Sequence, residues 1–408
     1  MKYKTSQYFT FEHGCGIDPP MAPAEPVHLY VHIPFCVQLC PYCSFHRVSY
    51  DQGLARQYFH ALKQELQMYH DLGFRFRGVY IGGGTPTIDM DELTEVLSLI
   101  RKLFSPEEIS IETNPDRLDG DTLVRLAEGG VKRVSVGVQS FNDDILRDIV
   151  RYEKYGGGLA LQEKLLHAKG YVDTLNVDMI YNFPSQTSEM FEGDLAVLKE
   201  VKPDQITFYP LMISDATRAK MEHLMGRVSY KQEKLFYQMI TSHLENLYQP
   251  SSAWCFSRKG TSMIDEYIVV SSEYVGVGSG AFGLIGGSIY ANTFSLENYI
   301  ARIADGMLPL SAKKVFSKKE MARYTFLMDL FGLRLDLTAF KKRFGAHLFS
   351  MLAWECLFFR GIGGIRIHPG SIELTRRGRY YWVTMMREFF IGVDNFRDFS
   401  REAAGIEI

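Results

Sequence analysis

Apolar positions along the chain follow two alternating periods, and this alternation predicts an α/β protein. Short runs typical of β-strands alternate with longer segments in which apolar residues recur every three or four positions, as at Leu54, Tyr58 and Leu62. This spacing predicts helices. Strands that alternate with helices form a parallel sheet covered by helices. Six such units are fewer than the eight of a closed barrel, so the pattern predicts an open, partial (β/α)6 barrel. The predicted strands span residues 28–33, 78–81, 109–113, 133–138, 175–180 and 205–209.

The alternation of strand and helix patterns ends after Tyr209. A helical pattern near residues 230–247 precedes a glycine-rich segment at 274–283. Beyond Ser317 the spacing predicts a small C-terminal helical, winged-helix-like domain. Its predicted elements are helices at 320–330, 337–344, 347–359 and 377–390, and a hairpin formed by 361–367 and 372–374. We therefore divide the chain into a lead-in at 1–26, a barrel at 27–250, a glycine-rich extension completing the core at 251–316 and the C-terminal domain at 317–408.

Composition narrows the function classes. The chain has 408 residues, 46% of them hydrophobic and 23% charged, with a formal net charge of -3. This is ordinary globular composition without the basic excess of a nucleic-acid-binding surface. No apolar run is long enough to span a membrane, and the first residues do not form the apolar core of a signal peptide. We expect a cytoplasmic protein that binds no nucleic acid.

Three of the six cysteines lie within eight residues, at Cys36, Cys40 and Cys43. Clustered thiols in a reducing compartment bind metal more often than they form bridges, and thiolates are the usual ligands of iron–sulfur clusters. Three thiolates on a four-iron cluster would leave one iron open for a ligand. The alternatives are a zinc site completed by His46, or three unliganded core cysteines. The isolated Cys15, Cys255 and Cys356 are expected to be buried small hydrophobes.

The segment from Tyr30 to Cys43, with Tyr-Val-His-Ile-Pro-Phe-Cys followed by Cys-x-x-x-Cys-x-x-Cys spacing, resembles the radical S-adenosylmethionine (radical SAM) superfamily. It is similar to the branch that contains the oxygen-independent coproporphyrinogen III oxidase and the heme chaperone. The resemblance implies a [4Fe–4S] cluster on the three cysteines, with S-adenosylmethionine on the open iron. It also implies a 5′-deoxyadenosyl radical as the reactive species and a low-potential electron donor of the flavodoxin or ferredoxin type.

The same resemblance assigns residues to the cosubstrate. Gly83, Gly84 and Thr85 follow the second predicted strand and would contact its methionyl part, because glycines let the backbone approach a ligand. Polar residues at later strand ends would contact its ribose, amino and carboxylate groups, the position at which barrel enzymes place their chemistry. Taken singly, they would be interpreted as helix caps or surface ion pairs. The remaining assigned residues are Glu112, Gln139, Arg151 and Asp178, with Tyr30 beside the cluster and with the roles of His32 and His46 left open.

Substrate does not follow from the resemblance. The oxidase has a further cysteine where this chain has Phe45, and the chaperone has a His-Asn-x-x-Tyr-Trp pattern where this chain has Asp265–Val270. The first hypothesis is an enzyme acting on a tetrapyrrole-like or other large organic substrate, by dehydrogenation or by methyl or methylene transfer, with one or two molecules of S-adenosylmethionine. The second is a heme carrier with a regulatory cluster. A DNA-associated regulator is disfavoured, because no basic run is apparent in the tail.

Overall fold

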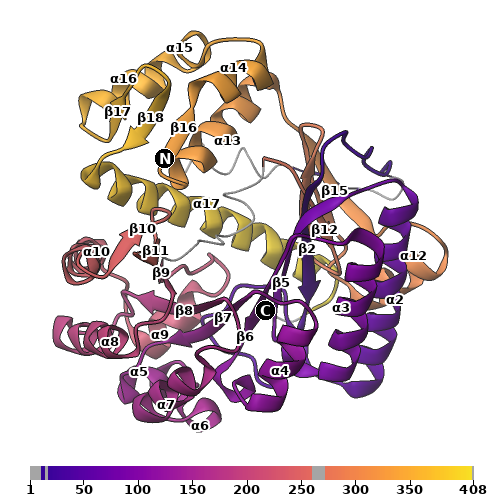
Figure 1. Ribbon diagram of the computed structural model, residues 1–408, viewed down its shortest axis with the longest axis horizontal. Coiled ribbons are helices and arrows are strands. Elements are labelled where there is room, and N and C mark those ends of the chain that lie inside the picture. Colours follow the sequence, from indigo (N-terminus) through magenta and orange to yellow (C-terminus); the bar gives the residue numbers. More distant parts are fainter. Residues whose placement is uncertain (1–10, 14–16, 260–271, 407–408) are drawn as a thin grey trace.

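The computed structural model describes residues 11–13, 17–259 and 272–406 and shows an α/β fold around a 13-stranded sheet (Figure 1). The six predicted strands lie side by side and parallel, in chain order. The first of them is buried along its whole length, as in parallel sheets covered by helices. The predicted α/β class is therefore confirmed. These strands are β2 (Val27–Ile33), β5 (Phe76–Gly83), β6 (Glu108–Thr113), β7 (Arg133–Gln139), β8 (Thr174–Tyr181) and β9 (Gln205–Pro210).

Helices that connect or follow these strands cover the outside of the sheet (Figure 1). Their apolar residues repeat with the helical period and face the sheet, as Leu93, Val96 and Leu97 do. This packing leaves the carboxyl ends of the strands free to carry polar side chains. The helices are α2 (Gln52–Asp71), α3 (Met90–Phe104), α4 (Gly120–Glu128), α5 (Asp143–Asp148), α6 (Tyr152–Tyr155), α7 (Gly158–Ala168), α8 (Ser188–Val201), α9 (Arg218–Met225) and α10 (Tyr230–Leu244), with single 3-10 turns at Pro86–Ile88 and Pro115–Arg117.

The sheet extends beyond the six predicted strands at both edges. The glycine-rich segment forms β12 (Tyr274–Val277), which pairs in parallel with β2, and β13 (Phe282–Ile285), which turns back antiparallel. At Gly276 a Cβ would lie 2.0 Å from the Phe282 carbonyl oxygen, so only glycine allows this close pairing. The remaining strands are β14 (Ser288–Asn292), β15 (Leu310–Val315) and β1 (Glu12–His13) at one edge, β11 (Cys255–Arg258) and β10 (Tyr248–Pro250) at the other, and α12 (Leu296–Ala304) lies between β14 and β15.

The C-terminal region is helical, as predicted, around a three-stranded sheet. The predicted hairpin is completed by a third strand, and the single helix predicted at 347–359 is interrupted at Leu352. The last helix extends well past the predicted end at residue 390 and runs between the C-terminal region and the parallel strands (Figure 1). The elements are α13 (Lys318–Phe331), β16 (Arg334–Asp336), α14 (Leu337–Phe344), α15 (Leu348–Met351), α16 (Ala353–Gly361), β17 (Ile365–Ile367), β18 (Ser371–Leu374) and α17 (Arg376–Ala403).

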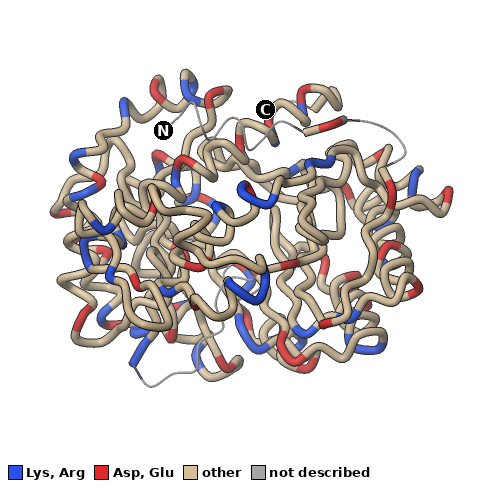
Figure 2. The backbone as a smooth tube through the Cα atoms, turned by 90° about the horizontal axis from the view of Figure 1, so that it is seen from above, with Lys and Arg blue, Asp and Glu red and all other residues tan. Residues whose placement is uncertain are grey.

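Charged residues of both signs are interspersed over the helices and loops (Figure 2). Within the described residues, every helix is too short or too polar to cross a membrane. The domain boundaries at residues 26, 250 and 316 stay predictions.

Candidate active site

A cavity of about 300 Å³ lies where the parallel strands end, between the sheet and α17. It is lined by all of the predicted site residues except Thr85, which is buried directly behind Cys36. Thr85 donates to the Cys36 sulfur at 3.7 Å and accepts from the Asn114 amide at 2.9 Å. Residues from six different segments therefore meet in one place, because the carboxyl ends of parallel strands share one edge of a sheet.

The cysteine loop leaves the end of a short strand and returns beside it. Strand β3 (Phe35–Cys36) pairs in parallel with β4 (Val48–Ser49), which fixes both ends of the loop. A turn between them brings the Cys43 amide within 3.2 Å of the Cys40 carbonyl oxygen. All three thiols are free and line the cavity. Burial, with the neighbouring thiols, raises the pKa of Cys36 to about 11 and also raises that of Cys43.

The glycine turn after β5 packs directly against the cysteine loop. The Gly84 amide donates to the Ile33 carbonyl, and the Thr85 amide donates to the Phe35 carbonyl, each at 2.8 Å. A Cβ on Gly84 would lie 2.6 Å from the Phe35 oxygen and 2.9 Å from the Cys36 sulfur. Gly83 has a φ of 123°, which side-chain-bearing residues rarely adopt. The turn therefore needs glycine for both space and backbone conformation.

Two partly buried carboxylates lie on β6 and β8, on either side of β7. Glu112 accepts hydrogen bonds from the Tyr80 hydroxyl at 2.9 Å and the Gly83 amide at 3.1 Å. Asp178 accepts from Ser135 at 2.7 Å and Asn176 at 2.8 Å. Burial and the charge of Asp178 raise the pKa of Glu112 to about 7, and burial raises the pKa of Asp178. Both residues line the cavity.

Gln139 and Arg151 complete the polar side of the cavity. Gln139 has a φ of 75°, a strained conformation for glutamine, and its Oε1 is buried without a partner in the described part of the chain. The Arg151 guanidinium donates to Cys40 Sγ at 3.8 Å and to Asn114 Oδ1 at 3.1 Å, and it lies 4.3 Å from the ring centre of Tyr155. This arginine therefore joins the cysteine loop to the strand ends.

The family model of the radical SAM superfamily matches residues 30–198. The heme chaperone HemW of Lactococcus lactis is 30% identical over 285 residues, which is 68% of this chain and 74% of that protein. The chain belongs to the radical SAM superfamily. The oxygen-independent coproporphyrinogen III oxidase of Salmonella typhimurium is 29% identical over 395 residues, covering 88% of this chain and 84% of its own length. The solved structure of the coproporphyrinogen III oxidase HemN from Escherichia coli superposes with a TM-score of 0.75, at 25% identity and 91% coverage of each chain.

Radical SAM proteins carry a [4Fe–4S] cluster and S-adenosylmethionine, and the residues of this cavity fit both groups. Three soft thiol donors face one chamber, and the buried Arg151 guanidinium beside Cys40 compensates negative charge there. The unpartnered Gln139 oxygen offers an acceptor to a bound molecule. In the described residues, no three His, Cys, Asp or Glu side chains could hold one metal ion. A [4Fe–4S] cluster does not need three side chains around one ion, because each thiol binds a different iron.

The histidines near the loop form a buried hydrogen-bonded chain. The Tyr30 hydroxyl lies 2.8 Å from His32 Nδ1, and His32 Nε2 lies 2.8 Å from the His46 carbonyl oxygen. His46 Nε2 faces Ser279 Oγ at 3.1 Å, which ties the loop to the glycine-rich segment. Burial lowers the pKa of His32 to about 4 and lowers that of His46, so both rings are neutral at pH 7.

The remaining cysteines lie outside the cavity lining or outside the described residues. Cys255 and Cys356 are buried, and Cys255 Sγ accepts a hydrogen bond from Thr207 Oγ1 at 3.6 Å. Cys15 and the segment Asp265–Val270 are not among the residues that the structure describes.

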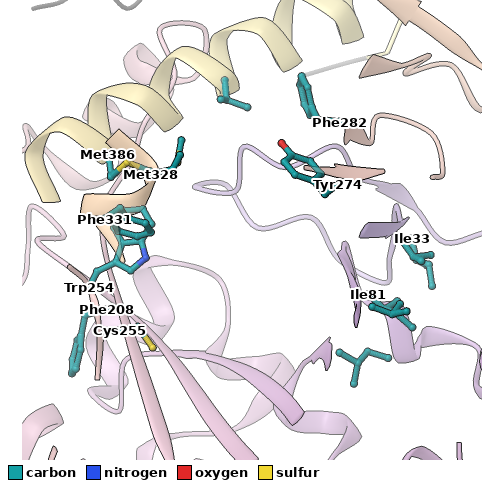
Figure 3. Packing of buried hydrophobic residues seen from close by; sticks show 14 of the residues in the cluster. Ile33, Ile81, Phe208, Trp254, Cys255, Tyr274, Phe282, Met328, Phe331 and Met386 are labelled. Carbon is teal, nitrogen blue, oxygen red and sulfur yellow. The ribbon is translucent and has the colours of Figure 1, made fainter. Parts of the chain in front are cut away.

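The outer half of the cavity was missed by the sequence analysis. Aromatic and methionine side chains form its walls, and two charged residues of α17, Asp394 and Arg397, face it. Figure 3 shows Trp254 on one side of this space and Tyr274 and Phe282 on the other, beneath α17. The apolar spacing that continues to Val393 and Phe396 would have extended the last helix into this region. The other wall residues are Tyr324, Met328, Phe389 and Phe390.

Proposed function

We propose that this chain is a radical SAM enzyme of the oxygen-independent coproporphyrinogen III oxidase-like branch, acting on a tetrapyrrole-like or other large organic substrate. Its reaction is a dehydrogenation or a methyl or methylene transfer. One observation carries the proposal: the three thiols, the polar strand ends and a large aromatic chamber line the same cavity. A substrate in the outer chamber therefore lies next to the cosubstrate site.

Each site residue has a proposed role. Cys36, Cys40 and Cys43 hold the cluster, while Gly83, Gly84 and Thr85 seat the methionyl part of S-adenosylmethionine. Glu112 and Asp178 accept hydrogen bonds from hydroxyl or amino groups, and Gln139 and Arg151 hold the polar end. Tyr30 lies beside the cluster. When bound, the two cofactors together supply a 5′-deoxyadenosyl radical by reductive cleavage of the sulfonium.

The fold also provides shielding and access. Helix α17 and the aromatic wall keep water from the chamber, which protects a reactive radical from side reactions. On the other side of the loop, Val37 and Leu39 are exposed, at 62% and 39%. This outer side gives a low-potential electron donor of the flavodoxin or ferredoxin type an approach to the cluster.

The second candidate is a heme carrier in which the cluster and S-adenosylmethionine regulate transfer. Relatives of this chain include the heme chaperones HemW of Bacillus subtilis, which is 29% identical over 333 residues, and of Lactococcus lactis. Phe45 stands where the resemblance places a cysteine in the oxidase, and it lines the cavity here. These observations favour the carrier over oxidative decarboxylation of coproporphyrinogen.

The test is anaerobic reconstitution with iron and sulfide, reduction, and addition of S-adenosylmethionine. We expect 5′-deoxyadenosine and a cluster EPR signal that S-adenosylmethionine perturbs. A cluster that assembles without cleaving S-adenosylmethionine, while the protein binds heme stoichiometrically, would contradict the enzyme and support the carrier.

The matched variants are Cys40→Ala and Cys255→Ala. We expect Cys40→Ala to lose the cluster and its absorbance while keeping its far-UV circular dichroism. Cys255→Ala should keep the cluster, because Cys255 is buried outside the cavity lining. Retained iron and activity in Cys40→Ala would refute the ligand assignment.

A further inference from the structure

Arg397 projects from α17 towards the outer half of the cavity. Its guanidinium carbon lies 4.8 Å from the ring centre of Phe45 and 5.6 Å from that of Phe282. Nη1 donates to Asp394 Oδ1 at 2.9 Å, which is the only hydrogen bond of this guanidinium within the described residues. A guanidinium has five N–H donors in a planar fork. Several donors of Arg397 are therefore left for a ligand in the chamber.

Trp254 offers a second donor on the opposite side of this space. Its ring is almost fully buried, and Nε1 has no acceptor in the part of the chain that the structure describes. The ring packs against Tyr209, Phe331 and Phe390, and the residue lines the cavity (Figure 3). A buried indole N–H normally has a hydrogen-bond partner. The missing partner indicates that a ligand supplies the acceptor.

The walls between these two donors are flat and apolar. Tyr274 and Phe282 contribute rings from the glycine-rich strands, and Phe389 and Phe390 contribute rings from α17. Aromatic side chains on two sides of a chamber favour a planar conjugated molecule, which can stack against both. The chamber therefore fits a flat, mostly apolar body.

Charged residues of both signs lie around the α17 end of the chamber. Arg47, Arg397 and Arg401 face Asp394 and Asp398 there. Arg401 Nη1 lies 3.8 Å from Asp398 Oδ1, and Arg47 donates to the Cys40 carbonyl at 2.8 Å. Arg47, Asp394 and Arg397 line the chamber itself, whereas Asp398 and Arg401 lie outside its lining.

We propose that Arg397 binds a carboxylate of the substrate and that Trp254 donates to an acceptor on it, which makes these two residues determine specificity for a planar, conjugated, carboxylate-bearing molecule. The inference rests on the proposed function for the identity of the chamber as the substrate site. It adds the two residues that recognise the substrate and the groups on the substrate that they bind. Asp394 then competes with the substrate for Arg397, because both carboxylates need the same guanidinium.

The test measures binding rather than turnover, with two porphyrins that differ only in their carboxylates. Protoporphyrin IX and its dimethyl ester are titrated with the reconstituted full-length protein, and porphyrin fluorescence anisotropy gives each Kd. We expect Arg397→Met to weaken protoporphyrin binding about tenfold or more, since a charge-assisted hydrogen bond is lost. Ester binding should change less than about twofold, because the ester offers no carboxylate to Arg397.

Two further variants should change porphyrin binding differently from Arg397→Met. Asp394→Asn removes the competing carboxylate, so protoporphyrin should bind several-fold more tightly. Trp254→Phe keeps a ring but removes the donor, so both porphyrins should bind more weakly. Arg376→Met is the matched control, because Arg376 lies on the same helix but is 63% exposed and pairs with Glu245. It should bind both porphyrins as the unmodified protein does.

Three results would overturn the proposal. If Arg397→Met weakens both porphyrins equally, or if Asp394→Asn weakens protoporphyrin as Arg397→Met does, the ion pair only supports the fold. If the unmodified protein binds neither porphyrin, the substrate class is wrong. Cleavage of S-adenosylmethionine is measured on the same samples and separates this failure from that of the proposed function. Circular dichroism and iron content of each variant show that fold and cluster are retained.

Discussion

At the scale of single residues, the contact between Gly84 and the cysteine loop leaves no room for a side chain. The ideal Cβ position on Gly84 is 2.6 Å from a backbone oxygen, which cannot move away as a flexible side chain would. We expect Gly84→Ala to cost about 1–3 kcal/mol of unfolding free energy, as overpacking does. It should also lower the iron bound per chain after reconstitution, because the Cys36 sulfur is displaced.

The control for this prediction is Gly193→Ala. Gly193 lies in α8, and a Cβ there meets nothing within 4 Å. This variant should keep its iron and become slightly more stable, because alanine favours a helix over glycine by up to about 1 kcal/mol. Equal stability and iron content in both variants would show that the turn tolerates a side chain.

The site residues differ in how far the sequence could predict them. The cysteine spacing and the polar residues at strand ends were visible because parallel strands bring consecutive carboxyl ends to one edge. Glu112 and Asp178 could therefore be expected in one cavity before any coordinates, although their roles stay predictions. Arg397 and Trp254 could not be predicted to line the same cavity, because they come from distant segments whose meeting depends on the position of α17.

At the scale of elements, Glu65 joins α2 to the glycine-rich segment. Its carboxylate accepts from the Tyr299 hydroxyl at 2.6 Å, the Gly278 amide at 2.8 Å and the Asn292 amide at 3.0 Å. Burial raises the pKa of Glu65 from its usual value of 4.5 to about 7. The folded protein therefore holds this proton more tightly than the unfolded chain does.

The sign of the pH dependence follows from linkage. Between pH 4.5 and 7 the folded state binds more protons at this group, so its contribution to stability falls as pH rises. We expect this contribution to drop by about 2 kcal/mol from pH 5.5 to pH 8. Urea unfolding at both pH values should show a drop that is about 2 kcal/mol smaller in Glu65→Gln than in the unmodified protein, because other buried carboxylates such as Glu112 still contribute in the variant. An identical pH dependence in both proteins would contradict the assignment.

The elements that the sequence analysis missed share a physical cause. Strand β12 is four residues long and contains glycine, so neither period nor propensity distinguishes it from a loop. Its pairing with β2 is a tertiary contact between distant segments. By contrast, the six parallel strands were correct within a few residues, because their patterns repeat over several strand positions. The last helix was predicted to end at residue 390 and ends at Ala403.

At the scale of the whole molecule, α17 connects the C-terminal region to the barrel. Near its middle, Arg387 forms a buried ion pair with Glu233 of α10, and the Tyr380 hydroxyl donates to the same carboxylate at 3.2 Å. The Arg387 guanidinium also lies 4.2 Å from the ring centre of Tyr230. This contact holds the helix over the cavity, so the position of Arg397 depends on it.

Removing Arg387 alone should cost more stability than removing Arg387 and Glu233 together. Arg387→Met leaves the fully buried Glu233 without its cation, so we expect a loss of about 3–5 kcal/mol of unfolding free energy. Adding Glu233→Leu removes the uncompensated charge, so the double variant should recover much of that loss. Urea unfolding of the unmodified protein, both single variants and the double variant measures the coupling. If the double variant is as unstable as the sum of the single variants, the pair does not couple, and α17 is held by its apolar contacts alone.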